Sequence, residues 1–311
     1  MKKFFKSLML ISVCLGLSAT VNAKTFRYAT TGDILGLDPH ANNEGPTNTM
    51  KGNIYGRMLH RKADLSLEPD LATKWEKLDA NTWRFSLRRG VKFHNGNDFN
   101  ADDVLFSYKR QTQEASDMSF ALATIKQINK VDDYTVDLIT KGPDPILLLN
   151  MPMFYIVDKE WIEANNAFEV VRASGSTNFA NVNTNGTGPF KVVEWIQDTR
   201  IVLEPFEGYW GKNQIQHNLT KAVFTPISND ATRVAALLSG EIDLMYPVPL
   251  QDVKRLNNDP NTEALEGPEL RTIFLGYDQW RNESLDMPGS GKNPFKDKRV
   301  RQAFHHAINI N

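Results

Sequence analysis

The chain has 311 residues, of which 41% are hydrophobic and 10% aromatic, and its formal net charge at pH 7 is −1. A chain of this length and composition can bury one large core or two medium ones. The near-neutral charge argues against a nucleic-acid or anionic-membrane partner, because such partners require clustered positive charge.

The amino terminus has the pattern of a secretory signal peptide over residues 1–23. Three lysines precede an uncharged apolar run at 8–19, and a Val-Asn-Ala sequence that ends at Ala23 fits the cleavage pattern. The apolar run is too short to span a bilayer. We therefore expect export to the periplasm, with cleavage after Ala23 and a mature chain that begins at Lys24.

The single cysteine, Cys14, lies within this amino-terminal segment. Val13 precedes it at the point where a lipoprotein would have a small residue, so we expect cleavage without lipidation. The mature chain then has no disulfide, no thiol nucleophile and no thiolate metal site. Its stability must come from a hydrophobic core.

Alternating apolar and polar residues predict several strands, so the chain mixes strands with helices. The clearest strand is 82–88, where Trp83, Phe85 and Leu87 face one way. A polar loop is expected at 31–46. The other predicted strands are 24–30, 134–138, 190–195, 201–205, 221–226 and 242–245.

Capping residues predict where two of the helices begin and end. Asn100, with Asp103 three residues on, begins one helix. Ser228 or Asn229 begins another, which ends before Gly240.

A last helix is predicted to begin near Asp297, and its single apolar face requires a partner surface. A linker containing glycine and proline precedes it at 282–293. The chain stops at Asn311 without a capping glycine or a following strand, so we expect a fragment of a longer protein. The apolar face consists of Val300, Ala303, Phe304, Ala307 and Ile308.

Several motifs follow one another along nearly the whole mature chain. They are Leu-Asp-Pro-His at 37–40, Glu-Pro-Asp-Leu-Ala at 68–72, Trp-Glu at 75–76, the block at 82–96, Ala-Asp-Asp-Val at 101–104, Gly-Thr-Gly-Pro-Phe at 186–190, Gly-Tyr-Trp-Gly at 208–211 and the block at 295–303. In this order, they make the chain similar to the peptide- and nickel-binding periplasmic solute-binding proteins, known as family 5.

The resemblance implies an α/β fold of the periplasmic binding protein-like type II, a clamshell that holds solute between two lobes. It implies a mostly complete first lobe over 24–271, with an inserted subdomain. Residues 272–311 would form the hinge strand and the truncated start of the second lobe. By the same resemblance, the protein is a monomer that captures peptides or similar small solutes and delivers them to the permease of an ABC transporter in the inner membrane.

The resemblance also implies where the first lobe meets its solute. Asn43, Glu44, Gly45 and Pro46 are similar to the loop that contacts the ligand backbone in this family. Pro46 has no N–H to donate, so a main-chain contact there must use its carbonyl group. A looser match suggests an aromatic wall beside this loop, formed by Met118, Ser119 and Phe120.

No motif indicates catalysis, a cofactor or a metal site. Asp102 and Asp103 lie at a helix start, where negative charge is favourable, so we interpret them as capping residues. The adjacent His305 and His306 would point about 100° apart on a helix and cannot share one metal face. The segment 289–292 lacks the first glycine and the final Ser or Thr of a phosphate-binding loop.

Three alternatives to a peptide receptor remain open. One is a receptor of the same fold for a nickel chelate, an opine or an oligosaccharide. Another is a secreted hydrolase, although no hydrolase nucleophile motif is recognisable. The third is an inactive truncated fragment, because half a clamshell exposes an apolar face.

Overall fold

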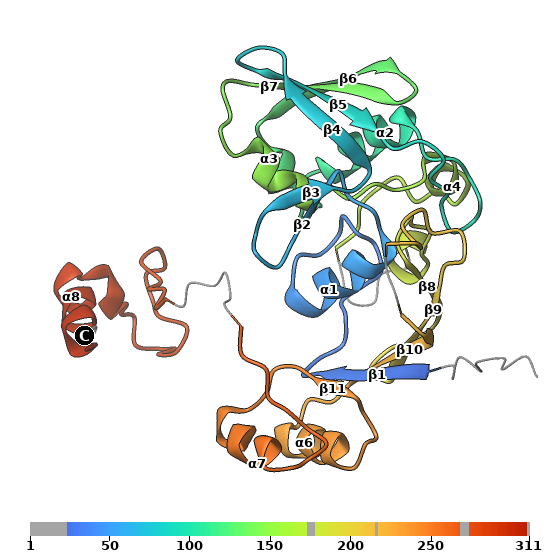
Figure 1. Cartoon of the computed structure of the whole chain (residues 1–311). Coiled ribbons are helices and arrows are strands. Elements are labelled where there is room, and N and C mark those ends of the chain that lie inside the picture. Colours follow the sequence, from blue (N-terminus) through green and yellow to red (C-terminus); the bar gives the residue numbers. More distant parts are fainter. Residues whose placement is uncertain (1–23, 173–177, 215–216, 268–273, 310–311) are drawn as a thin grey trace, which may run out of the picture. The chain divides into compact units, whose positions relative to one another are not determined.

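The computed structural model describes residues 24–172, 178–214, 217–267 and 274–309 (Figure 1). The predicted signal peptide lies outside these residues. The chain forms two compact units, Met1–Ala264 and Leu265–Asn311, and each is described by itself. Within the described ranges, no helix is long and apolar enough to cross a membrane.

One sheet of the larger unit has five strands: β1 Lys24–Thr30, β8 Phe190–Ile196, β9 Arg200–Pro205, β10 Leu219–Pro226 and β11 Leu244–Met245. Their order is β11-β1-β10-β9-β8. β1 pairs in parallel with β10 on one side and with β11 on the other, and β9 and β8 continue the sheet in antiparallel pairing. All five strands were predicted from the sequence and are present, but β11 is shorter than the predicted 242–245.

A second sheet is antiparallel throughout and has the order β4-β5-β7-β6. Its strands are β4 Ala72–Lys77, β5 Thr82–Leu87, β6 Ile125–Asp132 and β7 Thr135–Thr140, and a separate hairpin consists of β2 Leu59–Arg61 and β3 Leu67–Pro69. In the central strand β5, Phe85 and Leu87 are buried and Trp83 packs partly against the same core. The predicted period-two pattern of this strand is therefore confirmed. Sequence analysis missed β2, β3, β4 and β6.

The helices are α1 Gly45–Ile54, α2 Ala101–Gln111, α3 Leu147–Asn150, α4 Lys159–Ala164, α5 Phe179–Val182, α6 Asp230–Leu238, α7 Val253–Asn257 and α8 Lys298–Ala307. Short 3₁₀ helices lie at Ser119–Leu122, Met151–Met153, Leu250–Asp252 and Pro294–Lys296. Asn100 and Asp103 form the predicted capping box of α2. Asn229, one of the two candidates, caps α6, and Gly240 follows that helix with a φ of 73°.

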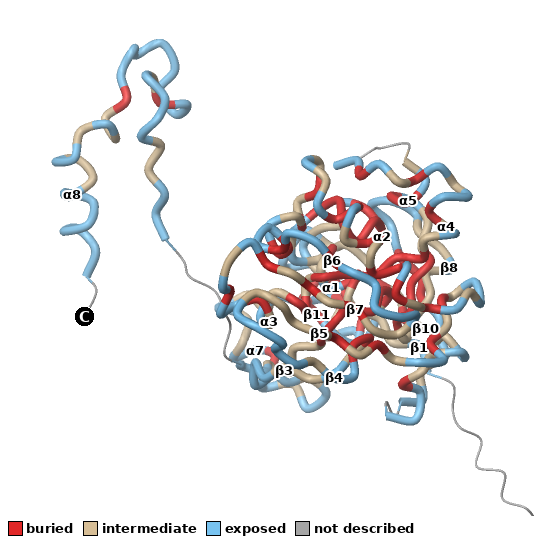
Figure 2. The backbone as a smooth tube through the Cα atoms, turned by 90° about the horizontal axis from the view of Figure 1, so that it is seen from above, coloured by how far each residue is buried: buried red, intermediate tan, exposed pale blue. Residues whose placement is uncertain are grey.

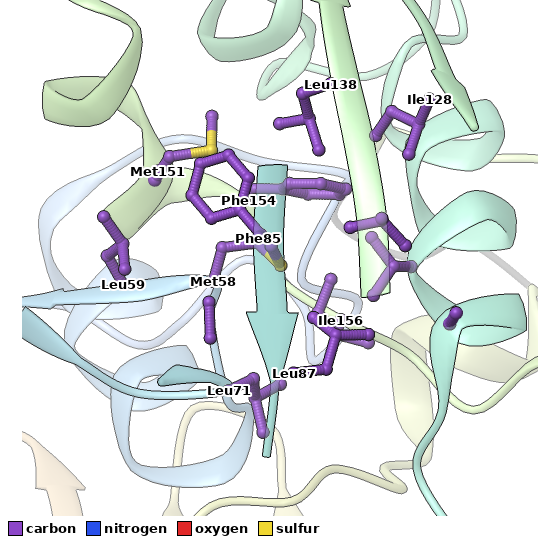
Figure 3. Close-up of a cluster of buried hydrophobic side chains, with 14 of the residues drawn as sticks. Met58, Leu59, Leu71, Phe85, Leu87, Ile128, Leu138, Met151, Phe154 and Ile156 are labelled. Carbon is purple, nitrogen blue, oxygen red and sulfur yellow. The ribbon is translucent and has the colours of Figure 1, made fainter. Parts of the chain in front are cut away.

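The largest core lies between the four-stranded sheet and α2. Figure 3 shows Phe85 of β5 among side chains from other parts of the chain, including Met58, Leu138 and Phe154. Burying each large apolar side chain of this kind stabilises the fold by roughly 1.5–3 kcal/mol. This core therefore holds β5 and α2 in fixed positions.

A second core joins the five-stranded sheet to α1, because Met50 and Ile54 pack in one cluster with Ile201, Leu203 and Phe224. A smaller third cluster lies between β1, β11, α6 and α7. Figure 2 shows the buried positions concentrated inside the larger unit, with exposed positions around them. The second core thus fixes α1 against the five-stranded sheet.

The smaller unit contains α8, which Asp297 caps as predicted by accepting the main-chain N–H of Arg299 at 2.8 Å. Tyr277, Phe295 and Phe304 form an aromatic cluster, with ring centroids 5.3–5.7 Å apart. Phe304, on the predicted apolar face of α8, is nevertheless 44% exposed. In the described part of this unit, no hydrophobic side chain is buried.

The predicted boundary between 271 and 272 lies outside the described residues. The boundary between the two compact units lies earlier in the chain, after Ala264. Residues 274–277, the described part of the expected hinge strand, are not in a strand. The assignment of lobes and hinge therefore stays a prediction.

Candidate functional site

The four residues expected at the solute-binding loop span the start of α1. Glu44 caps this helix, since its Oε1 accepts the main-chain N–H of Thr47 at 2.7 Å. Gly45 and Pro46 lie in the first turn, so the predicted loop ends two residues earlier than position 46. Proline is favoured in a first turn because an N–H there has no partner within the helix. Sequence analysis missed this helix.

The start of α1 presents polar groups to solvent. Asn43 and Gly45 are exposed, whereas Glu44 and Pro46 are half-buried. The Asn43 side-chain oxygen accepts a hydrogen bond from the Asn48 side chain at 2.7 Å, which fixes the exposed asparagine. The N–H of Thr47 in this first turn is taken by Glu44 and Pro46 has none, so the main-chain N–H that the turn can offer a ligand is that of Gly45. We call residues 43–46 the rim.

The structure brings the second predicted segment close to the chain that leads into the rim. The main-chain N–H of Asp117 donates to the carbonyl of Ala41 at 3.2 Å, and the Ser116 hydroxyl donates to the carbonyl of His40 at 2.8 Å. Residues 116–117 are therefore bound to the chain just before the rim. The role of 118–120 as a wall beside the rim stays a prediction.

The three residues of the predicted aromatic wall differ in exposure. Met118 is 1% exposed and packs in the core beneath the rim. Phe120 is 50% exposed, and Ser119 is intermediate. Only Ser119 and Phe120 therefore offer side-chain surface to a solute, whereas Met118 is part of the hydrophobic core.

A buried ion pair supports the chain before the rim. Arg110 of α2 donates to both carboxylate oxygens of Asp38, at 2.8 and 2.6 Å, and neither side chain is exposed. Burial alone would raise the pKa of Asp38, but the charge and hydrogen bonds of Arg110 outweigh it and hold this pKa below its ordinary value. Arg110 also donates to the carbonyl of Ala167, which ties α2 to a third segment.

His40 completes this buried network in its neutral form. Burial lowers the pKa of His40 to about 3, and the neighbouring Arg110 charge acts in the same direction. Nδ1 lies 3.1 Å from Arg110 Nη1, and Nε2 lies 3.0 Å from the carbonyl oxygen of Tyr155. A neutral ring that accepts at Nδ1 and donates at Nε2 satisfies both contacts.

A buried lysine lies beneath the rim. Lys51 of α1 is 1% exposed, and its ammonium group donates to the carbonyl of Asn42. Burial lowers the pKa of Lys51 to about 8, although the negative charges of Asp38, Glu44 and Asp117 act in the opposite direction. Lys51 therefore carries its charge at neutral pH and holds the chain just before the rim.

Tyr246 is a candidate contact residue that sequence analysis missed. It follows β11, and its main-chain N–H donates to the carbonyl of Ala29 at the end of β1, at 3.0 Å. A cis peptide bond joins it to Pro247, and the residue is 54% exposed. Ligands of open α/β sheets bind at the carboxyl ends of parallel strands, where this tyrosine lies. An aromatic residue and a proline directly after a predicted strand were the only sequence signal for it.

One group of carboxylates has a spacing that would suit a metal ion. Atoms of Asp103, Asp158 and Glu160 lie within 4.8 Å of one another. The oxygens of Asp158 and Asp103 already accept hydrogen bonds from main-chain and side-chain N–H groups. These donors are the side chains of Asn95, Asn97 and Asn185 and the main-chain N–H groups of Trp161, Lys159 and Asn100. The two aspartates therefore act as structural acceptors.

Comparison with known sequences identifies one family. The sequence model of the bacterial extracellular solute-binding proteins, family 5 Middle, matches residues 66–311. The dipeptide-binding protein of Escherichia coli K12 is 31% identical over 96% of this chain and 56% of its own length. Heme-binding protein A of Haemophilus influenzae is 29% identical over 91% of this chain and 53% of its own length. The chain thus spans about half the length of these relatives.

Solved structures show the same fold. The periplasmic binding protein DppA of Helicobacter pylori, in complex with the peptide STSA, is 31% identical with a TM-score of 0.67. The match covers 76% of this chain and 49% of that one. The binding protein AgaA of A. tumefaciens R10, in complex with agropinic acid, is 26% identical with a TM-score of 0.68, and the match covers 76% and 46% of the two chains. The predicted α/β fold of type II periplasmic binding proteins is therefore confirmed.

Proposed function

Because the chain belongs to family 5 of the bacterial extracellular solute-binding proteins, whose members bind solutes and are not enzymes, we propose that it captures short peptides for an ABC importer. The observation that carries this proposal is the rim, a helix start with exposed polar groups, and Phe120 adds a half-exposed aromatic side chain on the segment that follows residues 116–117. The peptide cargo is supported by relatives named for dipeptides and oligopeptides.

The rim would bind the main chain of an extended peptide. The oxygens of Asn43 and Glu44 accept from peptide N–H groups, and the Gly45 main chain lies open to the ligand. Pro46 has no N–H, and carbonyl groups within a helix accept N–H groups one turn later, so Pro46 contributes only contact surface. Main-chain contacts of this kind give affinity without selecting a particular peptide sequence.

Phe120 and Tyr246 would provide surfaces for peptide side chains. Both are about half exposed. Aromatic side chains offer large contact areas at a low cost in conformational entropy. The buried Asp38–Arg110 pair keeps the chain before the rim ordered in the absence of ligand, which lowers the entropy cost of binding.

In the complete clamshell, a second lobe would close over the rim and contact the solute only in the closed state. Ligand binding would then shift the protein from open to closed. The chain would be exported with its signal peptide, residues 1–23, cleaved after Ala23. In the periplasm it would act as a monomer and pass the peptide to the permease in the inner membrane.

A second candidate cargo is an opine. Structures of relatives in complex with agropinic acid and mannopinic acid are 26% and 25% identical to this chain, each with a TM-score of 0.68. An opine receptor would bind agropinic acid more tightly than any dipeptide.

Isothermal titration calorimetry of the natural full-length protein tests the proposal, with a dipeptide pool, agropinic acid and a nickel chelate as separate titrants. We expect saturable heat with the peptides alone. Glu44→Gln should weaken peptide binding about tenfold, because a hydrogen bond to a charged group becomes a neutral one. Glu76→Gln, an exposed position on β4, is the matched control and should leave binding unchanged.

Binding heat with agropinic acid and none with peptides would contradict the peptide proposal and indicate an opine receptor. No heat with any titrant, for a protein whose folding is verified by circular dichroism, would contradict a receptor role for these cargoes. Equal weakening in Glu44→Gln and Glu76→Gln would contradict the assignment of the rim.

A further inference from the structure

A pocket of about 710 Å³ lies near the C-terminal end of α1, within the larger unit. The helix Gly45–Ile54 is about 15 Å long, at ~1.5 Å per residue, so the pocket and the rim lie at opposite ends of it. The pocket walls also include the β2–β3 hairpin, the residue after β5, the turn before β8 and the chain after β9. Its charged lining residues are Arg57, Glu68, Asp70 and Arg88, and His60 lines it too.

Asp70 connects the two arginines of this pocket. Its Oδ2 accepts the main-chain N–H of Arg57 at 3.1 Å, and its main-chain carbonyl accepts Arg88 Nε at 2.8 Å. Within the described ranges, neither guanidinium forms an ion pair with a carboxylate. Two arginines therefore flank one aspartate without being neutralised by direct contact.

Most N–H donors of the two guanidinium groups have no protein acceptor in the part of the chain that the structure describes. Arg57 has only a long contact of 3.5 Å from Nη2 to the carbonyl of Gly52, and its Nε is buried without a partner. Arg88 uses Nε on Asp70, and its Nη groups have no protein acceptor among the described residues. Arginine carries five N–H donors, and buried polar groups are normally hydrogen-bonded. Of these donors only Arg57 Nε is fully buried, and the remaining N–H groups of the two half-exposed guanidinium groups are open to the oxygens of an anion.

Arg88 is also held in a fixed orientation. Its guanidinium carbon lies 3.7 Å from the ring centroid of Trp210, which lines the same pocket. This stacking orders the flat guanidinium group and leaves its edge free for hydrogen bonds. Arg57 lies 5.7 Å from the ring centroid of Tyr155, so an aromatic ring lies close to this guanidinium as well.

We propose that this pocket binds a small oxyanion, such as a sulfate, phosphate or carboxylate group, between the guanidinium groups of Arg57 and Arg88. The planar fork of N–H donors matches two oxygens of such a group. The negative charges of Asp70 and Glu68 oppose binding, and Tyr209 and His60 complete the titratable groups of the pocket. The site does not depend on the proposed transport function, because it does not include the rim.

The charge of Asp70 makes anion binding depend on pH. Burial raises the pKa of Asp70 to about 6, although Arg57 and Arg88 act to lower it. The anion should therefore bind more tightly at pH 5, where Asp70 is neutral, than at pH 8. His60 acts in the same direction, because its protonation at low pH adds a positive charge that favours the anion. Its pKa lies below the ordinary 6.5. Replacing Asp70 with Asn at pH 8 isolates the contribution of Asp70.

Equilibrium dialysis of the natural full-length protein against radiolabelled sulfate tests the site, at constant ionic strength set with chloride. Sulfate keeps its double charge between pH 5 and pH 8, so its own titration does not contribute. We expect saturable binding of one equivalent at pH 5. Arg57→Gln and Arg88→Gln should each weaken it at least about tenfold, because each removes charge-assisted hydrogen bonds.

Arg89→Gln is the matched control. Arg89 adjoins Arg88 and also stacks on an aromatic ring, that of Tyr134 at 4.2 Å, but does not line the pocket. It should bind sulfate like the unaltered protein. Asp70→Asn should bind sulfate more tightly than the unaltered protein at pH 8.

The absence of saturable sulfate binding to folded protein would overturn the proposal. Undiminished binding in both arginine variants would also overturn it, and weaker binding in Asp70→Asn would overturn the role of Asp70. Circular dichroism verifies folding. If Arg88→Gln does not fold, Arg57→Gln decides the outcome, since the printed hydrogen bond of that side chain is only the long contact with the Gly52 carbonyl.

Discussion

Arg110 and Asp38, far apart in sequence, form a bidentate ion pair, and neither side chain is exposed to solvent. The pair joins α2 to the chain that leads from β1 to the rim. Removing one partner of a buried ion pair leaves a charge without compensation in the interior. The rim thus depends on a contact that lies entirely beneath the surface.

Replacing Arg110 with Met should lower the free energy of unfolding by about 3–5 kcal/mol, because the Asp38 charge remains buried and unpaired. Urea unfolding followed by circular dichroism measures this loss. The control is Arg200→Met, which removes an exposed pair with Glu194 and should change the free energy of unfolding far less. Similar losses in the two variants would contradict the prediction.

Replacing Gly188 with Ala should destabilise the turn that enters β8. A Cβ atom at this position would lie 2.6 Å from the main-chain oxygen of Asn53, and backbone atoms cannot move aside cheaply. The added methyl group should cost about 1–3 kcal/mol, as overpacking does in a core. Thermal unfolding measures the effect. Gly142→Ala, where a Cβ atom meets nothing within 4 Å, should change stability little, and a comparable loss there would exclude this explanation.

Met118 and Phe120 should respond differently to truncation, although only one residue separates them. Met118→Ala removes a buried side chain and should cost about 2–5 kcal/mol of stability. Phe120→Ala, at a half-exposed position, should change stability far less but weaken solute binding. Chemical denaturation and calorimetry of both variants measure the two effects. A stable Met118→Ala, or a Phe120→Ala that binds normally, would show that the wall is assigned incorrectly.

Asp103 should make stability depend on pH. Burial raises its pKa from 3.8 to about 7, with Glu160 and Asp158 acting in the same direction and two main-chain N–H groups opposing. A carboxyl group with a raised folded-state pKa stabilises the fold when protonated, so its contribution is complete below about pH 4. This contribution is lost as the pH rises from about 4 to 7. Asp103→Asn, which cannot ionise, should remove this part of the pH dependence.

Denaturant unfolding at a series of pH values tests the role of Asp103, and the difference between the variant and the unaltered protein isolates it from other groups. Asp102→Asn is the control, since that neighbouring side chain is exposed. Identical pH profiles for Asp103→Asn and the unaltered protein would refute the prediction.

The sequence by itself determined those features that depend on neighbouring residues. The alternation around Phe85 predicted β5, and Asn100, Asn229 and Asp297 were each identified at the start of a helix. The order of the motifs also identified the family and its fold. These features can be predicted from the sequence because a helix cap and the alternation of a strand each depend on residues only a few positions apart.

Only the tertiary structure decided which distant residues meet. It paired β1 with β10 and β11, which set Tyr246 beside the end of β1, and it joined Asp38 to Arg110. It buried Met118 while exposing Phe120, and it assembled the arginine pocket from five segments. Such contacts follow from the packing of whole sheets and helices. A local pattern of residues does not determine that packing.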